Sequence, residues 1–166
     1  MEYYEKDIKI HTGEEGEFLG VAGGNYRIVV RGEETDNNFA VIEMTVPPGG
    51  GPPPHSHPHI QETFYVVEGE IEFKTEAGKT IIGKGGFVNI PLGGAIHCFK
   101  NNSQFVVKLL CTVMPAGLEK LFAKVGAPTV IGEFLLIPEM TPERKELLKQ
   151  LDEEFHQTIY PPNYLD

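Results

Sequence analysis

The sequence predicts an all-β protein, in which short strands wrap into a single barrel and short helices follow at the C-terminus. Apolar and β-branched segments alternate with turns at short, even spacing over most of the chain. Glycine and proline, at 19 and 13 residues, supply these turns and argue against a helical bundle. With 166 residues, of which 40% are hydrophobic, the chain is long enough to bury one core without disulfide bonds.

Roughly ten strands are expected along the chain. Ile8 and Ile10 alternate with polar residues and predict an edge strand near the start. The clearest hairpin is formed by 63–67 and 71–74, which flank a tight turn at Gly69. After the strand at Ile8 and Ile10, the segments expected to form strands are 18–21, 26–31, 39–46, 63–67, 71–74, 80–82, 87–90, 95–99 and 105–113.

The periodicity becomes helical near the C-terminus. Residues 117–125 place apolar side chains at helical spacing. Thr141 is a suitable N-cap for a second helix, with Pro142 at its first position and Glu143 near the positive end of the helix dipole. We expect these helices to pack on the barrel or across a dimer, and a partner-binding helix is the alternative.

Three parts are therefore expected, namely a peripheral segment over 1–16, the barrel over 17–115 and a helical extension over 116–166. The net charge of −10 argues against nucleic acid or an anionic membrane surface as a partner. No apolar run resembles a leader or a membrane span. Cys98 and Cys111 lie in apolar segments, as reduced thiols do. These features predict a cytoplasmic protein.

Residues 49–62 hold the greatest concentration of chemical groups. A glycine–proline run precedes His55 and His57, which are two residues apart and so share one face of an extended chain. Glu62 lies an odd number of residues beyond His57, so it would face away unless residues 58–61 bend the chain. We expect this bend to lead into an antiparallel neighbouring strand, which Glu62 opens with its carboxylate on the histidine side.

The alternation of side chains along the strands predicts further residues of the site. Phe64 and Val66 share the face of Glu62 and are predicted to line the wall above the site. His97 is the best candidate for a fourth ligand, and Phe99 shares its parity, which suits either a pocket wall or the core. The weaker histidine candidates, by position, are His11, His59 and His156.

Two patterns in this region resemble the motifs of the cupin superfamily. Gly49-x5-His55-x-His57-x4-Glu62-x6-Gly69 has the spacing of the first motif. Gly85-x5-Pro91-x-Gly93-x3-His97-x3-Asn101 is similar to the second, with one extra residue between the glycine and the histidine. The resemblance extends over about residues 17–115 and implies a double-stranded β-helix, the jelly-roll barrel of cupins.

The resemblance also implies one divalent metal held by His55, His57, Glu62 and His97. Three imidazoles and a carboxylate suit Fe, Mn, Ni, Co, Cu or Zn and are a poor set for Ca or Mg. The alternative is that the histidines are structural, either hydrogen-bonded in the core or part of an exposed loop. Four groups that match a ligand pattern favour the metal.

Within the superfamily, the chain is similar to single-barrel proteins of the quercetin 2,3-dioxygenase type. The similarity lies in residues 62–70, in His97-x-Phe99-x-Asn101 and in residues 115–122. It implies an oxidoreductase, a metal-dependent dioxygenase that acts on an enolisable or aromatic small molecule, with Glu62 as the catalytic proton acceptor. The alternatives are a metal-dependent isomerase or lyase, and a non-catalytic barrel that binds a small molecule.

A homodimer is also expected. Residues 64–67 carry apolar side chains on both faces of one strand, so the outer face of the barrel needs a cover. Proteins of the cupin type commonly provide it by pairing with a second copy. The other expected partners are the small-molecule substrate and dioxygen.

Overall fold

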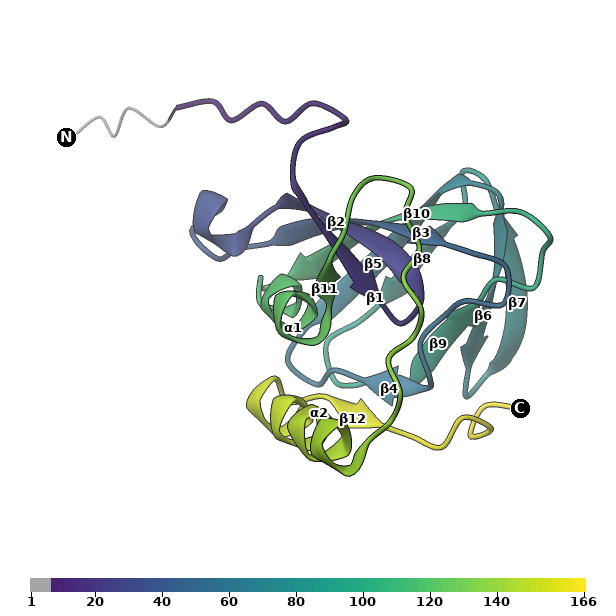
Figure 1. The fold of residues 1–166 in the computed structure, drawn as a ribbon. Helices are drawn as coiled ribbons and strands as arrows, with labels where there is room; N and C mark the ends of the chain where they lie inside the picture. The colour runs from purple at the N-terminus through teal and green to yellow at the C-terminus, as the bar shows by residue number, and fades with distance from the viewer. Residues whose placement is uncertain (1–6) are drawn as a thin grey trace.

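The structure, a computed structural model, describes residues 7–166 and consists mainly of two antiparallel β-sheets that face each other. The order of strands in the larger sheet is β11 (Ala127–Pro128), β1 (Glu17–Val21), β2 (Gly24–Val30), β3 (Ala40–Val46), β10 (Val107–Met114), β5 (Gln61–Glu68) and β8 (Phe87–Ile90). The order in the smaller sheet is β12 (Thr158–Ile159), β4 (His55–Ser56), β9 (His97–Lys100), β6 (Glu70–Thr75) and β7 (Gly78–Gly83). This arrangement confirms the predicted jelly-roll fold (Figure 1).

The core lies between the two sheets and follows from strand alternation. In β3 and β10 every second side chain is buried, as expected for strands with one face on a core. β10 lies between β3 and β5, and its register places Leu109 opposite Met44 on one side and Val66 on the other. β5, which carries Glu62, is therefore held between two paired neighbours and cannot shift without breaking the core.

The path of residues 57–61 differs from the prediction. The expected antiparallel pairing between the histidine segment and the strand of Glu62 is wrong, because β4 pairs with β9 and β12. β5 pairs instead with β10 and β8 in the other sheet. The turn at 58–59 thus carries the chain from one sheet to the other. Glu62 consequently approaches the histidines across the interior and not from an adjacent strand.

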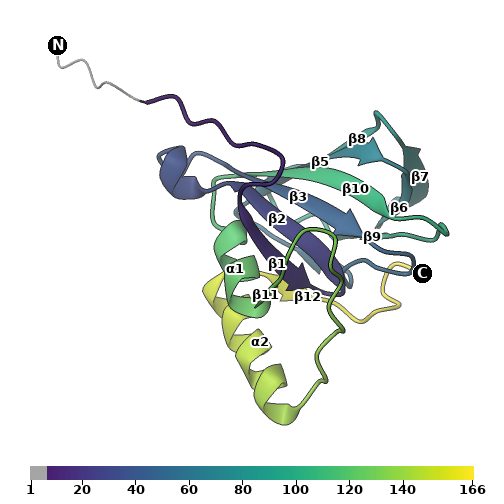
Figure 2. The same cartoon turned by 45° about the horizontal axis from the view of Figure 1, so that its top comes forward.

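The remaining elements lie around one end of the barrel. These are a short 3-10 helix, η1 (Gly32–Glu34), and two α-helices, α1 (Leu118–Val125) and α2 (Pro142–Glu154). Both views show α1 and α2 together on one side of the barrel (Figures 1 and 2). The Thr141 side chain caps α2 by accepting a hydrogen bond from the Arg144 N–H at 3.2 Å. The buried Glu119 carboxylate anchors α1 by accepting hydrogen bonds from the Gly32 and Gly117 N–H groups.

The predicted edge strand at Ile8 and Ile10 is wrong. Residues 7–12 have no regular structure, and the two isoleucines are 88% and 81% exposed. β1 pairs with β2 on one side, and β11 rather than this segment pairs with Leu19 and Gly20 on the other. Within the described residues, no helix is both long and apolar enough to cross a membrane.

Asn101 joins the ends of the two sequence motifs. Its side chain is fully buried, and its amide donates to the carbonyl oxygens of Val46 at 3.0 Å and Phe105 at 2.7 Å. Its backbone exchanges hydrogen bonds with the glycine turn, from Gly49 N–H to its carbonyl and from its own N–H to the Gly50 carbonyl. This single residue therefore fixes the start of the histidine segment against the end of β9.

Asn101→Ala should lower the free energy of unfolding by about 1–3 kcal/mol, because it removes the amide that donates to the carbonyls of Val46 and Phe105 and the Oδ1 that accepts from the N–H and hydroxyl of Ser103. Urea unfolding followed by circular dichroism measures the loss. Asn102→Ala is the matched control, since Asn102 is exposed and donates only to Glu72 at 3.2 Å. Its effect should stay within about 0.5 kcal/mol. Equal losses in the two variants would contradict the assigned role of Asn101.

Candidate metal centre

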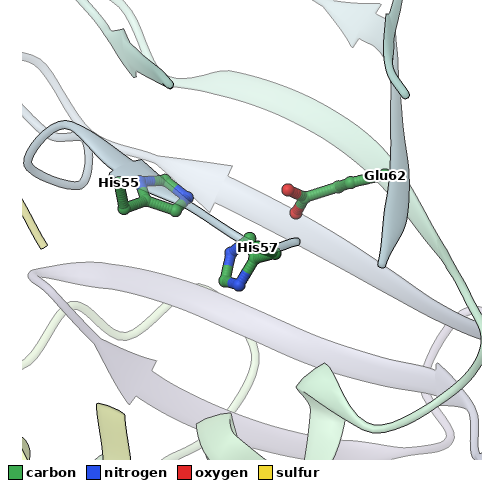
Figure 3. A group of neighbouring side chains, drawn as sticks. All are labelled: His55, His57 and Glu62. Atoms are coloured by element: carbon green, nitrogen blue, oxygen red, sulfur yellow. The ribbon is translucent and has the colours of Figure 1, made fainter. Parts of the chain in front are cut away.

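Three potential metal ligands meet between the sheets. His55 lies on β4, His57 directly follows that strand, and Glu62 lies on β5 of the facing sheet. The ligand atoms of these three residues all lie within 4.8 Å of one another, and all three side chains are buried. Figure 3 shows the carboxylate of Glu62 pointing across the interior toward the two imidazoles. The group has the size and composition needed to hold one metal ion.

His97 lies next to the group formed by His55, His57 and Glu62. Its register partner across the β4–β9 pair is His55, and the two ring centroids are 4.4 Å apart. His97 Nε2 lies 3.2 Å from Glu62 Oε2, and the His97 side chain is fully buried. All four residues of the predicted ligand set therefore come together, although two sheets and some forty residues of chain separate them.

Backbone carbonyls orient two of the imidazoles. His55 Nδ1 donates to the carbonyl oxygen of Pro53 at 2.8 Å, and His97 Nδ1 donates to that of Ala95 at 2.9 Å. A carbonyl oxygen can only accept, so the proton resides on Nδ1 and the lone pair on Nε2. This pattern is typical of metal-binding histidines, whose second ring nitrogen is fixed by a backbone or carboxylate acceptor.

One atom in the group has no partner, and one contact needs a proton or a cation to be favourable. His57 Nδ1 is buried and has no hydrogen-bond partner among the described residues. The Nε2 lone pair of His97 faces the carboxylate of Glu62, so this contact needs either a proton on Nε2 or a cation beside it. A metal ion at the centre of the group would satisfy both atoms, and the residues present therefore fit such an ion.

The electrostatic environment favours the protonation states that metal ligands require. Burial, reinforced by the charge of His97, lowers the pKa of His55 to about 3, and burial also lowers the pKa of His57. Burial alone would raise the pKa of Glu62, but the contact with His97 and the neighbouring histidines lower it to about 2. At neutral pH His55 and His57 are thus neutral imidazoles and Glu62 is an anionic carboxylate.

Cys111 supports the carboxylate from behind. This fully buried thiol on β10 donates a hydrogen bond from Sγ to Glu62 Oε1 at 3.3 Å. Burial raises the pKa of the thiol well above its ordinary value, so it stays protonated and remains a donor. The sequence analysis assigned Cys111 only as a reduced core thiol. Its place opposite Phe64 in the β5–β10 register, two pairs from Glu62 and on the same face, could not be read from spacing alone.

A cavity of about 580 Å³ opens beside the group. Phe64 and Phe99, which were predicted as wall residues, both line it, whereas Val66 is fully buried and is not part of its wall. Sequence reasoning missed the outer wall altogether. That wall comes from α1, from residues 137–140 and from one face of α2. The periodicity of α2 was visible in the sequence, but nothing in it indicated that the helix covers this opening.

The remaining histidines lie elsewhere. His59 is exposed and its ring contacts that of His156, with centroids 5.2 Å apart. His11 pairs with Glu34 at 2.8 Å. The three histidines that the sequence analysis ranked as weaker candidates are therefore not part of the group.

The fold and the site resemble those of cupins. Residues 42–113 match the family model of the cupin domain, and this stretch contains all four candidate ligands.

Two curated relatives show which cupins the chain resembles. It is 28% identical over 114 residues to quercetin 2,3-dioxygenase of Bacillus subtilis (strain 168), a match that covers 69% of this chain and 33% of that protein. It is 43% identical over 77 residues to germin-like protein subfamily 2 member 2 of Arabidopsis thaliana, with 44% and 35% covered. The chain thus spans about a third of the length of the curated relatives it matches.

Solved structures support the fold alone. A predicted oxalate decarboxylase from Thermotoga maritima superposes with a TM-score of 0.58 at 19% identity and covers 65% of this chain and 99% of its own. The polyketide cyclase RemF from Streptomyces resistomycificus gives a TM-score of 0.55 at 20% identity, with 85% and 98% covered. One is named a decarboxylase and the other a cyclase, and the cupin barrel does not by itself specify a reaction.

The stability of chelator-treated protein should fall as the pH is lowered from neutrality. His55 takes up a proton near pH 6.5 when unfolded but only near pH 3 when folded, so acid favours the unfolded chain throughout this interval. His55 should contribute up to about 1.4 kcal/mol per pH unit there. The contribution of Glu62 to the free energy of unfolding is lost only below pH 4.5, as the pH falls toward about 2.

Urea unfolding at several pH values between neutral and about pH 5 measures the slope of the free energy of unfolding against pH. His55→Asn should flatten it, whereas Ser56→Ala, which alters the buried uncharged neighbour on the same strand, should keep the wild-type slope. Equal slopes in the wild type and His55→Asn would show that His55 is not held neutral by its surroundings.

Proposed function

We propose that this protein is a metal-dependent oxidoreductase of dioxygenase type that acts on an enolisable or aromatic small molecule. The observation that carries the proposal is the convergence of His55, His57 and Glu62 at a largely apolar cavity, with His97 Nε2 lying 3.2 Å from Glu62 Oε2. The 28% identity to a quercetin 2,3-dioxygenase over most of this chain supports the reaction class.

In this proposal the four residues hold one divalent transition metal, drawn from Fe, Mn, Ni, Co, Cu and Zn. The bound metal would supply Lewis acidity, which lowers the pKa of a substrate hydroxyl. This acidification matters because the low pKa of Glu62 makes its carboxylate a weak base toward an unactivated hydroxyl.

The protein's own groups then have distinct tasks. Glu62 Oε2 accepts the substrate proton, while the Cys111 thiol keeps Oε1 engaged and so fixes the orientation of the carboxylate. Phe64 and Phe99 lie beside the site and restrict access of water, which favours an electron-rich enolate that can react with dioxygen at carbon. His55 and His97 are held in place by the Pro53 and Ala95 carbonyls and need no rearrangement.

Metal content tests the first part of the proposal. Protein purified without chelators should carry about one transition-metal ion per chain by elemental analysis, and His55→Ala or Glu62→Ala should lower the metal affinity at least about tenfold. His59→Ala is the matched control, because this histidine lies four residues from His55 but outside the group. Metal-free wild-type protein, or equal retention by all variants, would refute the proposed site.

Oxygen consumption tests the reaction class. The metal-loaded protein, given flavonols or β-diketones, should take up about one dioxygen per substrate consumed, since both oxygen atoms enter the product of a dioxygenase. Glu62→Gln should lower the rate by about 10²–10⁴-fold, the usual contribution of a general base. Turnover without oxygen uptake would establish an isomerase or lyase instead. Binding without turnover would establish a non-catalytic barrel.

We further propose a homodimer and a reducing, cytoplasmic location. Tyr65 and Phe87 are register partners on the outer face of the larger sheet, and they are 45% and 62% exposed. Such an apolar pair is suited to a subunit contact. A monomer mass in sedimentation at micromolar concentration would exclude the dimer. The two cysteines are buried and unpaired, as is usual in a reducing compartment.

A further inference from the structure

The outer end of the cavity is positively charged. α2 turns one face toward the cavity, and this face carries Arg144, Lys145 and Lys149 together with Leu148 and Asp152. The spacing of these five residues is that of a single stripe along a helix. Three cations thus line the opening of a protein whose net charge is −10.

These three cations have no carboxylate partner among residues 7–166. Seven other lysines and arginines in the described part of the chain form ion pairs, which shows that acidic partners are plentiful. Arg144, Lys145 and Lys149 form none with a described residue, although α2 also carries exposed glutamates. Their charges therefore remain available to a molecule in the cavity.

The stability of the helix does not explain their positions. Arg144 and Lys145 lie in the first turns of α2, next to the positive end of the helix dipole, where cations are unfavourable. Lys145 and Lys149 are four residues apart, a spacing at which like charges repel. An anion bound at this end of the helix would relieve both effects.

Asp152 offsets only part of this charge. It lies two helical turns from Arg144, about 12 Å along the axis, although it is three residues, about 4.5 Å along the axis, from Lys149. Its carboxylate already accepts a hydrogen bond from Gln157 Nε2 at 2.9 Å. The positive charge is thus concentrated toward the N-terminal half of α2, and apolar side chains occupy the space between it and the histidine group, among them Phe64, Phe99 and Phe122.

We propose that the cavity selects an amphiphilic organic anion. Its apolar body lies against the phenylalanines, and its carboxylate or phosphate is held by Arg144, Lys145 and Lys149. This inference rests on the proposed function, which places the reacting end of the same molecule at Glu62. Arg144, Lys145 and Lys149 are accordingly residues that determine specificity and take no part in the chemical step.

Calorimetric titration with three probes of one shape tests the proposal, namely 2-naphthoate, 2-naphthyl phosphate and the neutral 2-naphthamide. The protein is titrated both metal-loaded and after chelator treatment, so that binding of the anion to a metal is separated from binding to α2. At least one anion should bind about tenfold or more tightly than the amide in both forms. The anion that binds more tightly identifies the anionic group. Salt should weaken its binding.

The variant Arg144→Gln/Lys145→Gln/Lys149→Gln should abolish this preference and leave the affinity for the amide unchanged. The control Lys9→Gln/Lys84→Gln/Lys100→Gln removes the same charge from three exposed lysines that are also unpaired but lie outside the cavity. It should bind all probes as the wild type does. Unfolding by urea verifies that both variants fold.

Several results would overturn the inference. These are equal affinity of the wild type for anions and amide, absence of binding by either anion, or a preference that persists without the three cations. The metal and oxygen experiments are independent of these titrations. Loss of metal binding or turnover with an intact anion preference would refute the proposed function alone. Intact metal binding and turnover without an anion preference would refute only the anion site.

Discussion

The burial of the Glu62 carboxylate among imidazoles is the constraint on which the rest of the site depends. An ionised group out of water is tolerated only when other groups compensate its charge, and here the compensating groups come from both sheets. His55 and His97 are neighbours in one sheet, and Cys111 reaches Oε1 from a strand paired with β5 in the other. The spacing of the two sheets, set by their core, therefore determines whether the four candidate ligands can serve one metal.

The C-terminal extension contributes to the same site from two directions. Its short strand β12 pairs with β4, and the Tyr160 N–H donates to the Pro54 carbonyl at 2.8 Å, next to His55. Its helix α2 forms the outer wall of the cavity. One segment thus steadies the strand that carries a candidate ligand and also shapes the space in which a substrate would lie. A change in this extension is expected to affect the site even though it contributes no ligand.

The part of the chain that matches the cupin domain differs in role from the parts outside the match. The cupin match ends at residue 113, so it includes the candidate ligands but excludes α1, α2 and β12. The barrel supplies a preorganised set of metal ligands, which many reactions can use. The parts outside the match supply the enclosure and the three unpaired cations of α2. If specificity differs among cupins of this size, such additions can be its physical cause, because α1, residues 137–140 and α2 form much of the cavity wall.

Much of the fold and the identity of the candidate ligands could be predicted from the sequence, because local patterns encode them. Alternation defined the strands, Thr141 and Pro142 marked the start of α2, and the motif spacing singled out His55, His57, Glu62 and His97. Parity within a strand shows which side chains share a face, but it does not show which sheet the strand joins. For this reason the turn after His57 was assigned to the wrong pairing. The thiol behind Glu62 and the helix across the opening depend on contacts between residues far apart in the chain. Only the packing of the two sheets and the extension decided them.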